Sequence, residues 1–262
     1  MQRRDLQTEL AFAHRLADAA GAVILPYFRH APDVENKASA EFDPVTAADR
    51  AAEQAMRDLI LAERPQDGVL GEEFPLHESR NGWSWTLDPI DGTRGFIAGT
   101  PTWCVLIALT YESRPVLGVI DQPHTGERFS GHDARAHLEL HGSQRDLAVS
   151  GTRSISDAIL ATTDPYLFEG REAEAFSALR RGVRLTRFGM DAYAYALLAA
   201  GGIDLVVESG LGPHDIHALV PVVRGAGGII TDWQGGDDFA TGRLVAAASR
   251  ELHAAALGKL AL

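Results

Sequence analysis

The residue pattern of this chain changes near Ser150, and that change constrains the fold more than any other feature. Before it, short β-like runs predict an antiparallel meander, and they cover residues 102–111, 115–121, 127–130 and 136–140. After it, strand-like and helix-like runs alternate, which favours α/β layering. The 262 residues therefore divide into an α+β half, 1–145, and an α/β half, 146–262, joined near residues 141–151.

Apolar residues at helical spacing predict two N-terminal helices, over 5–28 and 46–63. A predicted strand over 83–87 runs directly into an acidic segment, 88–93, and a short helix follows it as far as Gly99. In the second half, strands are expected at 159–163, 183–187, 203–207, 228–231 and 244–248. Helices are expected at 171–179, 191–200, 216–224 and 251–260, the third of them kinked or restarted near Pro221.

The overall charge and the cysteine content exclude several classes of protein. A formal net charge of −12 disfavours nucleic-acid binding, because the phosphate backbone is itself negative. The single cysteine, Cys104, allows no internal disulfide and fits a reducing cytoplasm. The N-terminus has no signal-peptide pattern, and the chain has no apolar run of the roughly 18 residues that a membrane span needs. A cytoplasmic protein is therefore expected.

The acidic segment after the strand at 83–87 contains the strongest candidates for functional residues. Asp88 and Asp91 flank a proline-containing turn and are close enough to bind one cation or two adjacent ones. Mg²⁺ prefers oxygen ligands, and the Ile90 carbonyl lies between the two carboxylates. Gly92 allows close approach of a phosphate, whose oxygens the amides of Gly92 and Thr93 would bind. An ordinary proline turn is the structural alternative.

Two further acidic patches lie elsewhere in the chain. Glu72 and Glu73 follow a short apolar stretch, where two adjacent carboxylates repel each other unless a cation or solvent intervenes. Asp215 precedes an apolar helix, where helix capping is the alternative. Taken one at a time, each acidic residue has a structural explanation that is at least as good as the functional one.

Taken together, these segments resemble the inositol monophosphatase family of lithium-sensitive, metal-dependent phosphatases. The matching segments, in family order and spacing, are DPVTAAD at 43–49, GEE at 71–73, WTLDPIDGT at 85–93, His214-Asp215 and GAGG at 225–228. The resemblance covers nearly the whole chain. It implies a layered αβαβα sandwich of the inositol monophosphatase and fructose-1,6-bisphosphatase type, and a small phosphorylated metabolite as the substrate.

The resemblance also implies roles for individual residues. Two or three Mg²⁺ ions are expected on Glu72, Asp88, the Ile90 carbonyl, Asp91 and Asp215, with Glu73 in a supporting position. The catalytic set is expected to comprise Glu72, Asp49 and Thr93, of which the last two orient the attacking water. Lys37 matches a lysine near the metals, and Glu208 matches a residue that contacts substrate hydroxyls. His214 and His217 are not expected to be ligands, because Mg²⁺ prefers oxygen.

The substrate is less constrained. The segments RGFIAG at 94–99, GMDAYAYA at 189–196 and DLVVESGL at 204–211 look like the histidinol-phosphatase branch of the family. Asp191 and Glu208 would then meet the ammonium and imidazole groups of histidinol phosphate, and Arg94 and Arg187 are further candidates for substrate binding.

Structural alternatives remain for the substrate-side residues. Asp191 fits a helix N-cap, Arg94 fits a surface salt bridge or a subunit contact, and Tyr193 and Tyr195 fit the core. An inositol monophosphatase, or a broader sugar-phosphate or nucleotide phosphatase, is the alternative enzyme. A non-catalytic metal-binding regulator is the alternative from another class. Many family members are homodimers, so a homodimer is expected.

Overall fold

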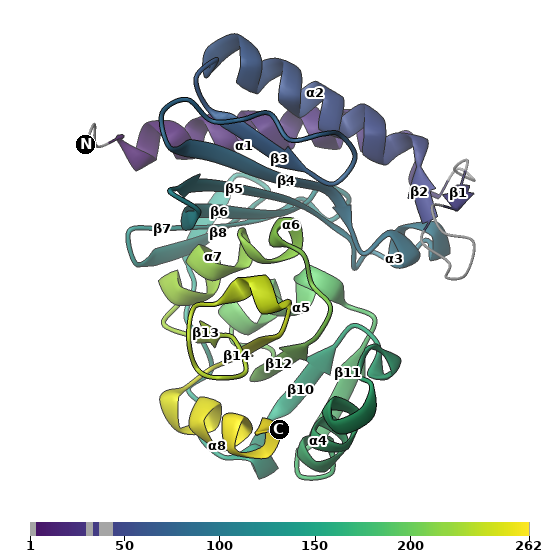
Figure 1. Cartoon of the computed structure of the whole chain (residues 1–262), viewed down its shortest axis with the longest axis vertical. Helices are drawn as coiled ribbons and strands as arrows, with labels where there is room; N and C mark the ends of the chain where they lie inside the picture. The colour runs from purple at the N-terminus through teal and green to yellow at the C-terminus, as the bar shows by residue number, and fades with distance from the viewer. Residues whose placement is uncertain (1–3, 30–33, 37–43, 262) are drawn as a thin grey trace.

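The computed structural model describes residues 4–29, 34–36 and 44–261. Their elements stack in five layers: two N-terminal helices, a first sheet, a middle layer of helices, a second sheet and two outer helices (Figure 1). This is the αβαβα sandwich predicted from the sequence. Lys37 lies outside the described residues.

The N-terminal helices cover the outer face of the first sheet. Helix α1 (Leu6–Ile24) begins at Asp5, whose carboxylate accepts a hydrogen bond of 3.1 Å from the Gln7 amide. Its apolar side and that of α2 (Ala47–Glu63) pack on Trp85 and its neighbours in one hydrophobic cluster. The predicted boundaries hold for α2, whereas α1 ends four residues before the predicted end at residue 28. Backbone pairing joins β1 (Val34–Asn36) and β2 (Pro44–Thr46) antiparallel.

In the described part of the chain, the first sheet has seven strands in sequence order. They are β3 (Gly68–Gly71), β4 (Trp83–Asp91), β5 (Cys104–Tyr111), β6 (Arg114–Gln122), β7 (Glu127–His132), β8 (Arg135–Leu140) and β9 (Ser143–Asp146). β3 pairs parallel with β4, and every later pair is antiparallel, so the predicted meander is confirmed. The sequence reading missed β9, because its four residues are polar and exposed and carry no alternation.

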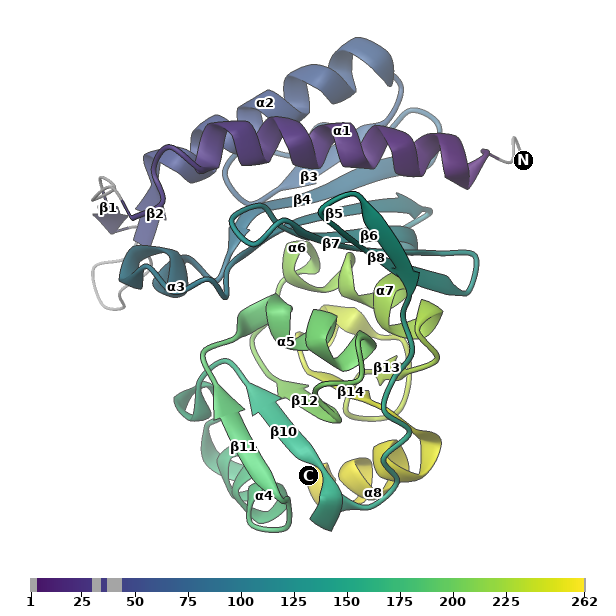
Figure 2. The ribbon, with the colours of Figure 1, turned by 180° about the vertical axis from the view of Figure 1, so that it is seen from behind.

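The second sheet has the order β11-β10-β12-β14-β13 in the described residues. Its strands are β10 (Ile159–Thr162), β11 (Leu185–Phe188), β12 (Leu205–Glu208), β13 (Ile229–Thr231) and β14 (Leu244–Ala247). Helices α4 (Gly170–Arg180) and α8 (Arg250–Leu260) cover its outer face, and α5 (Asp191–Ala199), α6 (Pro213–Ile216) and α7 (Leu219–Gly225) lie between the sheets. Figure 2 shows the chain passing from the first sheet to the second along one side of these middle helices.

The predicted helix over 216–224 is in fact two helices, and the break is not at Pro221. It lies at His217 and Ala218, between α6 and α7. Pro221 is the third residue of α7, in the first helical turn, where a backbone N–H has no intrahelical partner to lose. A proline at this position therefore fits within the helix.

Two glycines let the middle helices lie directly on the first sheet. A Cβ added to Gly118 in β6 would lie 2.1 Å from the carbonyl oxygen of Ala218, and one added to Gly131 in β7 would lie 2.4 Å from that of Pro221. The central hydrophobic cluster spans both sheets, with Phe129 and Ala246 among its members. The second half is thus fixed against the first. No helix in the described residues combines the length and the hydropathy needed to cross a lipid bilayer.

We expect Gly118→Ala to destabilise the protein by about 1–3 kcal/mol, because the backbone of α7 would have to move away from the sheet. The matched control is Gly258→Ala in α8, where an added Cβ meets nothing within 4 Å. It should stabilise the helix by about 0.5–1 kcal/mol. Urea unfolding measures both, and a Gly118→Ala protein as stable as wild type would contradict this close packing.

Candidate active site

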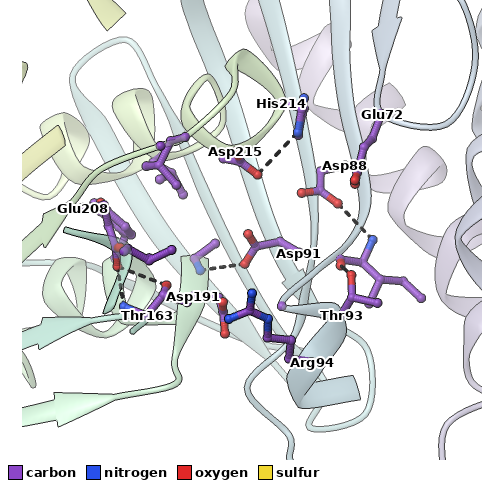
Figure 3. Close-up of a pocket in the computed structure, with 18 of the residues that line it drawn as sticks. Glu72, Asp88, Asp91, Thr93, Arg94, Thr163, Asp191, Glu208, His214 and Asp215 are labelled. Carbon is purple, nitrogen blue, oxygen red and sulfur yellow. Dashed lines mark hydrogen bonds and ion pairs between the residues drawn. The ribbon is translucent and has the colours of Figure 1, made fainter. Parts of the chain in front are cut away.

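A cavity of about 420 Å³ opens where the end of β4, the start of α5, the end of β12 and helix α6 meet (Figure 3). Its lining includes these predicted site residues: Glu72, Asp88, Ile90, Asp91, Gly92, Thr93, Arg94, Asp191, Glu208 and Asp215. Both halves of the chain contribute. The structure therefore brings together most of the side chains that the sequence motifs selected.

The acidic segment is part of β4 rather than a turn beyond its end. The strand continues to Asp91, and the pairing of β4 with β5 shifts register between Asp88 and Asp91. Pro89 has no N–H to give to a neighbouring strand, and such an irregularity accommodates it. Asp88 Oδ1 accepts a hydrogen bond from the Ile90 amide at 3.1 Å, and Asp91 Oδ2 accepts one from the Ala192 amide at 2.6 Å. These bonds fix both carboxylates at the cavity.

Three carboxylates converge at the centre of the cavity. One oxygen each from Asp88, Asp91 and Asp215 lie within 4.8 Å of one another. Asp215 is in α6, where its Oδ2 accepts a hydrogen bond of 2.6 Å from the Gly212 amide. Asp215 is thus not the helix N-cap, which is Gly212, but its carboxylate accepts a hydrogen bond from the N-cap amide at the third helical position and also belongs to the acidic cluster. His214 Nε2 lies 3.7 Å from the other oxygen.

The cluster carries negative charge that the protein buries. Burial raises the pKa of Asp88 well above its usual range, and Asp91, Glu72 and Asp215 raise it further. Burial also raises the pKa of Asp91, with added repulsion from Asp191 and Asp215. Carboxylate oxygens at this spacing are the donor set that a hard divalent cation prefers. The residues present thus fit the magnesium ions that the sequence implies.

A buried ion pair in α2 supports the turn that carries Glu72. Glu53 is 0% exposed; its Oε2 accepts a 2.7 Å hydrogen bond from the Glu73 amide, and its Oε1 accepts one of 2.7 Å from Arg57. Arg57 also donates to the Phe74 carbonyl at 3.1 Å. The Glu53 carboxylate fills the space beside Gly71, where an added Cβ would lie 2.0 Å from it. The sequence reading missed this pair, because Glu and Arg four residues apart on a helix are typical of an exposed surface.

Gly92 and Thr93 begin α3 (Thr93–Ala98) at the edge of the cavity. Gly92 has φ of 83°, which favours glycine, and an added Cβ would also lie close to Asp191 Oδ2, at 3.1 Å. The Thr93 hydroxyl donates to the Ile90 carbonyl at 3.1 Å. Asp49 is buried in the first turn of α2, and its charge acts on Asp88. The pairing of Asp49 with Thr93 stays a prediction.

Glu208 and Asp191 add two further carboxyl groups to the cavity: Glu208 lies across it from Glu72 and Asp88, and Asp191 lies between Glu208 and Gly92 (Figure 3). Glu208 accepts hydrogen bonds from the Thr163 amide at 2.7 Å and from the hydroxyls of Thr162 and Thr163 at 3.1 Å each. Burial raises its pKa to about 8. Burial likewise raises the pKa of Asp191 to about 6, and this residue has φ of 44°, which is strained for a non-glycine residue. Sequence reasoning missed Thr163, since a threonine after a strand carries no distinctive pattern.

The two arginines differ in position. Arg94 lines the cavity, and its guanidinium lies 3.5 Å from Asp164 in an exposed ion pair. Arg187 is exposed on the edge strand β11, and the described residues that line the cavity do not include it. His217 hydrogen-bonds to the Thr86 hydroxyl at 3.0 Å, and burial lowers its pKa to about 4, so it is neutral.

Comparison with known proteins agrees with this geometry. The model of the inositol monophosphatase family matches residues 5–261. The chain belongs to the inositol monophosphatase family. It is therefore a phosphatase, and the acidic cavity is the candidate site for its chemistry.

Relatives and solved structures support this family assignment. The chain is 45% identical to the bifunctional phosphatase IMPL2, chloroplastic, of Arabidopsis thaliana over 88% of its own length and 66%, just under two thirds, of the plant protein. It is 36% identical to a histidinol-phosphatase of Chlorobaculum parvum over 93% of each chain. A solved inositol monophosphatase from Zymomonas mobilis superposes with a TM-score of 0.87 at 41% identity, over 99% of this chain and 100% of that one.

We expect the contribution of Glu208 to the stability of the metal-free protein to fall as the pH rises from about 5 to about 8. In that range folded Glu208, with a pKa of about 8, still holds a proton that the unfolded chain has released, so the folded state binds more protons. Glu208→Gln should match wild type at about pH 5 and exceed it at about pH 8. Thermal unfolding in EDTA measures this, and identical pH profiles for the two proteins would contradict the raised pKa.

We expect Glu53→Ala to weaken binding of a divalent cation by roughly tenfold, because the turn that carries Glu72 loses its buried hydrogen bond. Thermal unfolding with increasing Mg²⁺ reports this as a shift in the concentration that gives half the stabilisation. The control is Asp121→Asn, which weakens a buried ion pair with Arg128 away from the cavity. Equal cation affinity in the Glu53 variant and the control would contradict the supporting role.

Proposed function

We propose that the protein is a Mg²⁺-dependent histidinol-phosphate phosphatase, which converts L-histidinol phosphate and water to L-histidinol and phosphate in histidine biosynthesis. One observation carries the proposal: the convergence of Asp88, Asp91 and Asp215 in a cavity that also holds the carboxyl groups of Asp191 and Glu208. The first feature suits cations and a phosphate group. The second suits a positively charged leaving alcohol.

The residues proposed to hold two or three Mg²⁺ ions are Glu72, Asp88, the Ile90 carbonyl, Asp91 and Asp215. When bound, these ions would neutralise the phosphate oxygens and lower the pKa of the attacking water. The all-oxygen donor set and the raised pKa of Asp88 and Asp91 support this assignment. Glu53 and the Gly212 and Ala192 amides hold the ligands in place.

The chain's own residues position the reacting groups. Asp49 and Thr93 are proposed to orient the water for in-line attack on phosphorus. The amides of Gly92 and Thr93 would bind phosphate oxygens, and Arg94 at the cavity edge adds a positive charge. Glu72 is proposed both to hold cation and to fix the water beside it. No residue has to form a covalent bond to phosphorus.

Substrate choice rests on Asp191 and Glu208. Histidinol phosphate carries an ammonium group and an imidazole ring, whereas a polyol phosphate carries only neutral hydroxyls. A positive group between the two carboxylates would lower their pKa values from about 6 and about 8 and so favour their charged forms. The relative from Chlorobaculum parvum carries the name histidinol-phosphatase, which supports this choice.

An inositol monophosphatase is the second candidate, because the similar structure from Zymomonas mobilis has that name. The hydroxyls of a polyol can also donate to Glu208. Homodimer formation, inhibition by Li⁺ and a cytoplasmic location are predictions of the same proposal. A non-catalytic cation-binding regulator is the candidate from another class.

Phosphate release from a panel of esters with Mg²⁺ tests the proposal. The panel is histidinol phosphate, inositol 1-phosphate, fructose 1,6-bisphosphate and adenosine 3′,5′-bisphosphate. We expect kcat/KM for histidinol phosphate to exceed the others by at least about tenfold, and Asp88→Asn to lower it by at least about a hundredfold. That variant should be no less stable than wild type in EDTA, because it removes a repelling charge.

Preference for inositol 1-phosphate would move the assignment to the second candidate. Cation binding without release of phosphate from any ester would favour the regulator. Full activity in Asp88→Asn would contradict the proposed site itself.

A further inference from the structure

Two tyrosines in α5, two residues apart, have hydroxyls in different situations. The Tyr193 hydroxyl donates to Glu127 Oε2 at 2.6 Å. Tyr195 is 1% exposed and lines the cavity, and its hydroxyl has no hydrogen-bond partner among the described residues. A buried phenol normally finds a partner, because an unmet O–H has given up its hydrogen bond to water. The Tyr195 hydroxyl is therefore a polar group whose partner is not among the residues that the structure describes.

The surroundings of Tyr195 define what that partner must be. The charged groups that act on its hydroxyl are the carboxylates of Glu208, Asp91 and Asp215. Burial and these carboxylates raise the pKa of Tyr195 well above its usual range, so it stays protonated and can donate. A donor without a partner among the described residues suits an acceptor atom on a bound ligand.

Other hydroxyl donors around the cavity are already committed. Thr93 donates to the Ile90 carbonyl, Thr163 donates to Glu208, and Ser209 donates to Glu172. Among these described lining residues, Tyr195 is the one whose hydroxyl has no hydrogen-bond partner, and its oxygen is buried in the cavity wall. Among the carboxylates that act on Tyr195, Glu208 has the largest effect, and Glu208 is a residue that we assign to the leaving alcohol.

We propose that the Tyr195 hydroxyl donates a hydrogen bond to an uncharged acceptor atom on the leaving alcohol of the substrate. The acceptor is an unprotonated imidazole nitrogen or a hydroxyl oxygen, and an ammonium group is excluded because it has no lone pair. A neutral imidazole accepts at one ring nitrogen and donates at the other, so it satisfies Tyr195 and a carboxylate together. This inference deepens the proposed function and rests on it.

Tyr195→Phe tests the inference, with Tyr193→Phe as the matched control on the same helix. Each variant is assayed with histidinol phosphate, with inositol 1-phosphate and with propyl phosphate, whose alcohol has no second polar group. Thermal unfolding in EDTA is measured in parallel. The two polar esters distinguish an imidazole acceptor from a hydroxyl acceptor.

We expect Tyr195→Phe to be as stable as wild type or more stable, because it removes a hydroxyl without a partner. Its kcat/KM should fall by roughly tenfold with the polar ester that wild type prefers and by less than about twofold with propyl phosphate. Tyr193→Phe should show the opposite pattern, with lower stability from the lost bond to Glu127 and wild-type kcat/KM.

Four results would overturn the inference. Loss of stability in Tyr195→Phe would mean that the hydroxyl has a partner within the protein. An equal loss of activity with all three esters would mean that the Tyr195 hydroxyl contacts the phosphate group. No loss with any ester would mean that the hydroxyl does not contact the substrate. If wild type prefers inositol 1-phosphate and Tyr195→Phe selectively loses activity with that ester, the histidinol-phosphate assignment is wrong. The proposed role of the Tyr195 hydroxyl is then still supported. No turnover of any ester by wild type would remove both.

Discussion

The mutual repulsion of carboxylates brought together in a buried cavity is the constraint on which the rest of this structure depends. Asp88, Asp91 and Asp215 would separate if the chain allowed it, since burial and like charge both disfavour their ionised forms. Backbone amides hold all three, through the bonds from Ile90 to Asp88, from Ala192 to Asp91 and from Gly212 to Asp215. Gly118 and Gly131 let α7 pack directly on the first sheet, and this packing fixes the two halves of the site relative to each other.

This arrangement explains why one site draws on such distant parts of the chain. Strand β4 carries Asp88 and Asp91 where its pairing with β5 shifts register. Helix α6, in the second half of the chain, carries Asp215. Helix α2 also contributes, because the carboxylate of its residue Glu53 fixes the turn that carries Glu72. An acidic cluster supported on each side is ready for a divalent cation before the cation arrives, which is what rapid electrostatic catalysis requires.

Local signals predicted the strands and helices of both halves, as alternating apolar residues did for the meander. The five layers and the grouping of Asp88, Asp91 and Asp215 were implied by the resemblance to the family, and the structure brings these carboxylates together. Polar β9 and the break at His217 lacked such signals. Glu53, Thr163 and Tyr195 were missed or assigned to the core, because their roles arise from burial against residues far away in the chain. Arg187 shows the reverse: its charge suggested a contact with substrate, but its strand leaves it exposed at the sheet edge.

The central claim is that the carboxylates of both halves hold divalent cations together. Electron paramagnetic resonance of Mn²⁺, used as a spectroscopic substitute for Mg²⁺, counts the ions bound per chain. The account predicts two or three bound ions that excess Mg²⁺ displaces, and loss of at least one in Asp215→Asn. No bound Mn²⁺, or the same number in wild type and in Asp215→Asn, would contradict it.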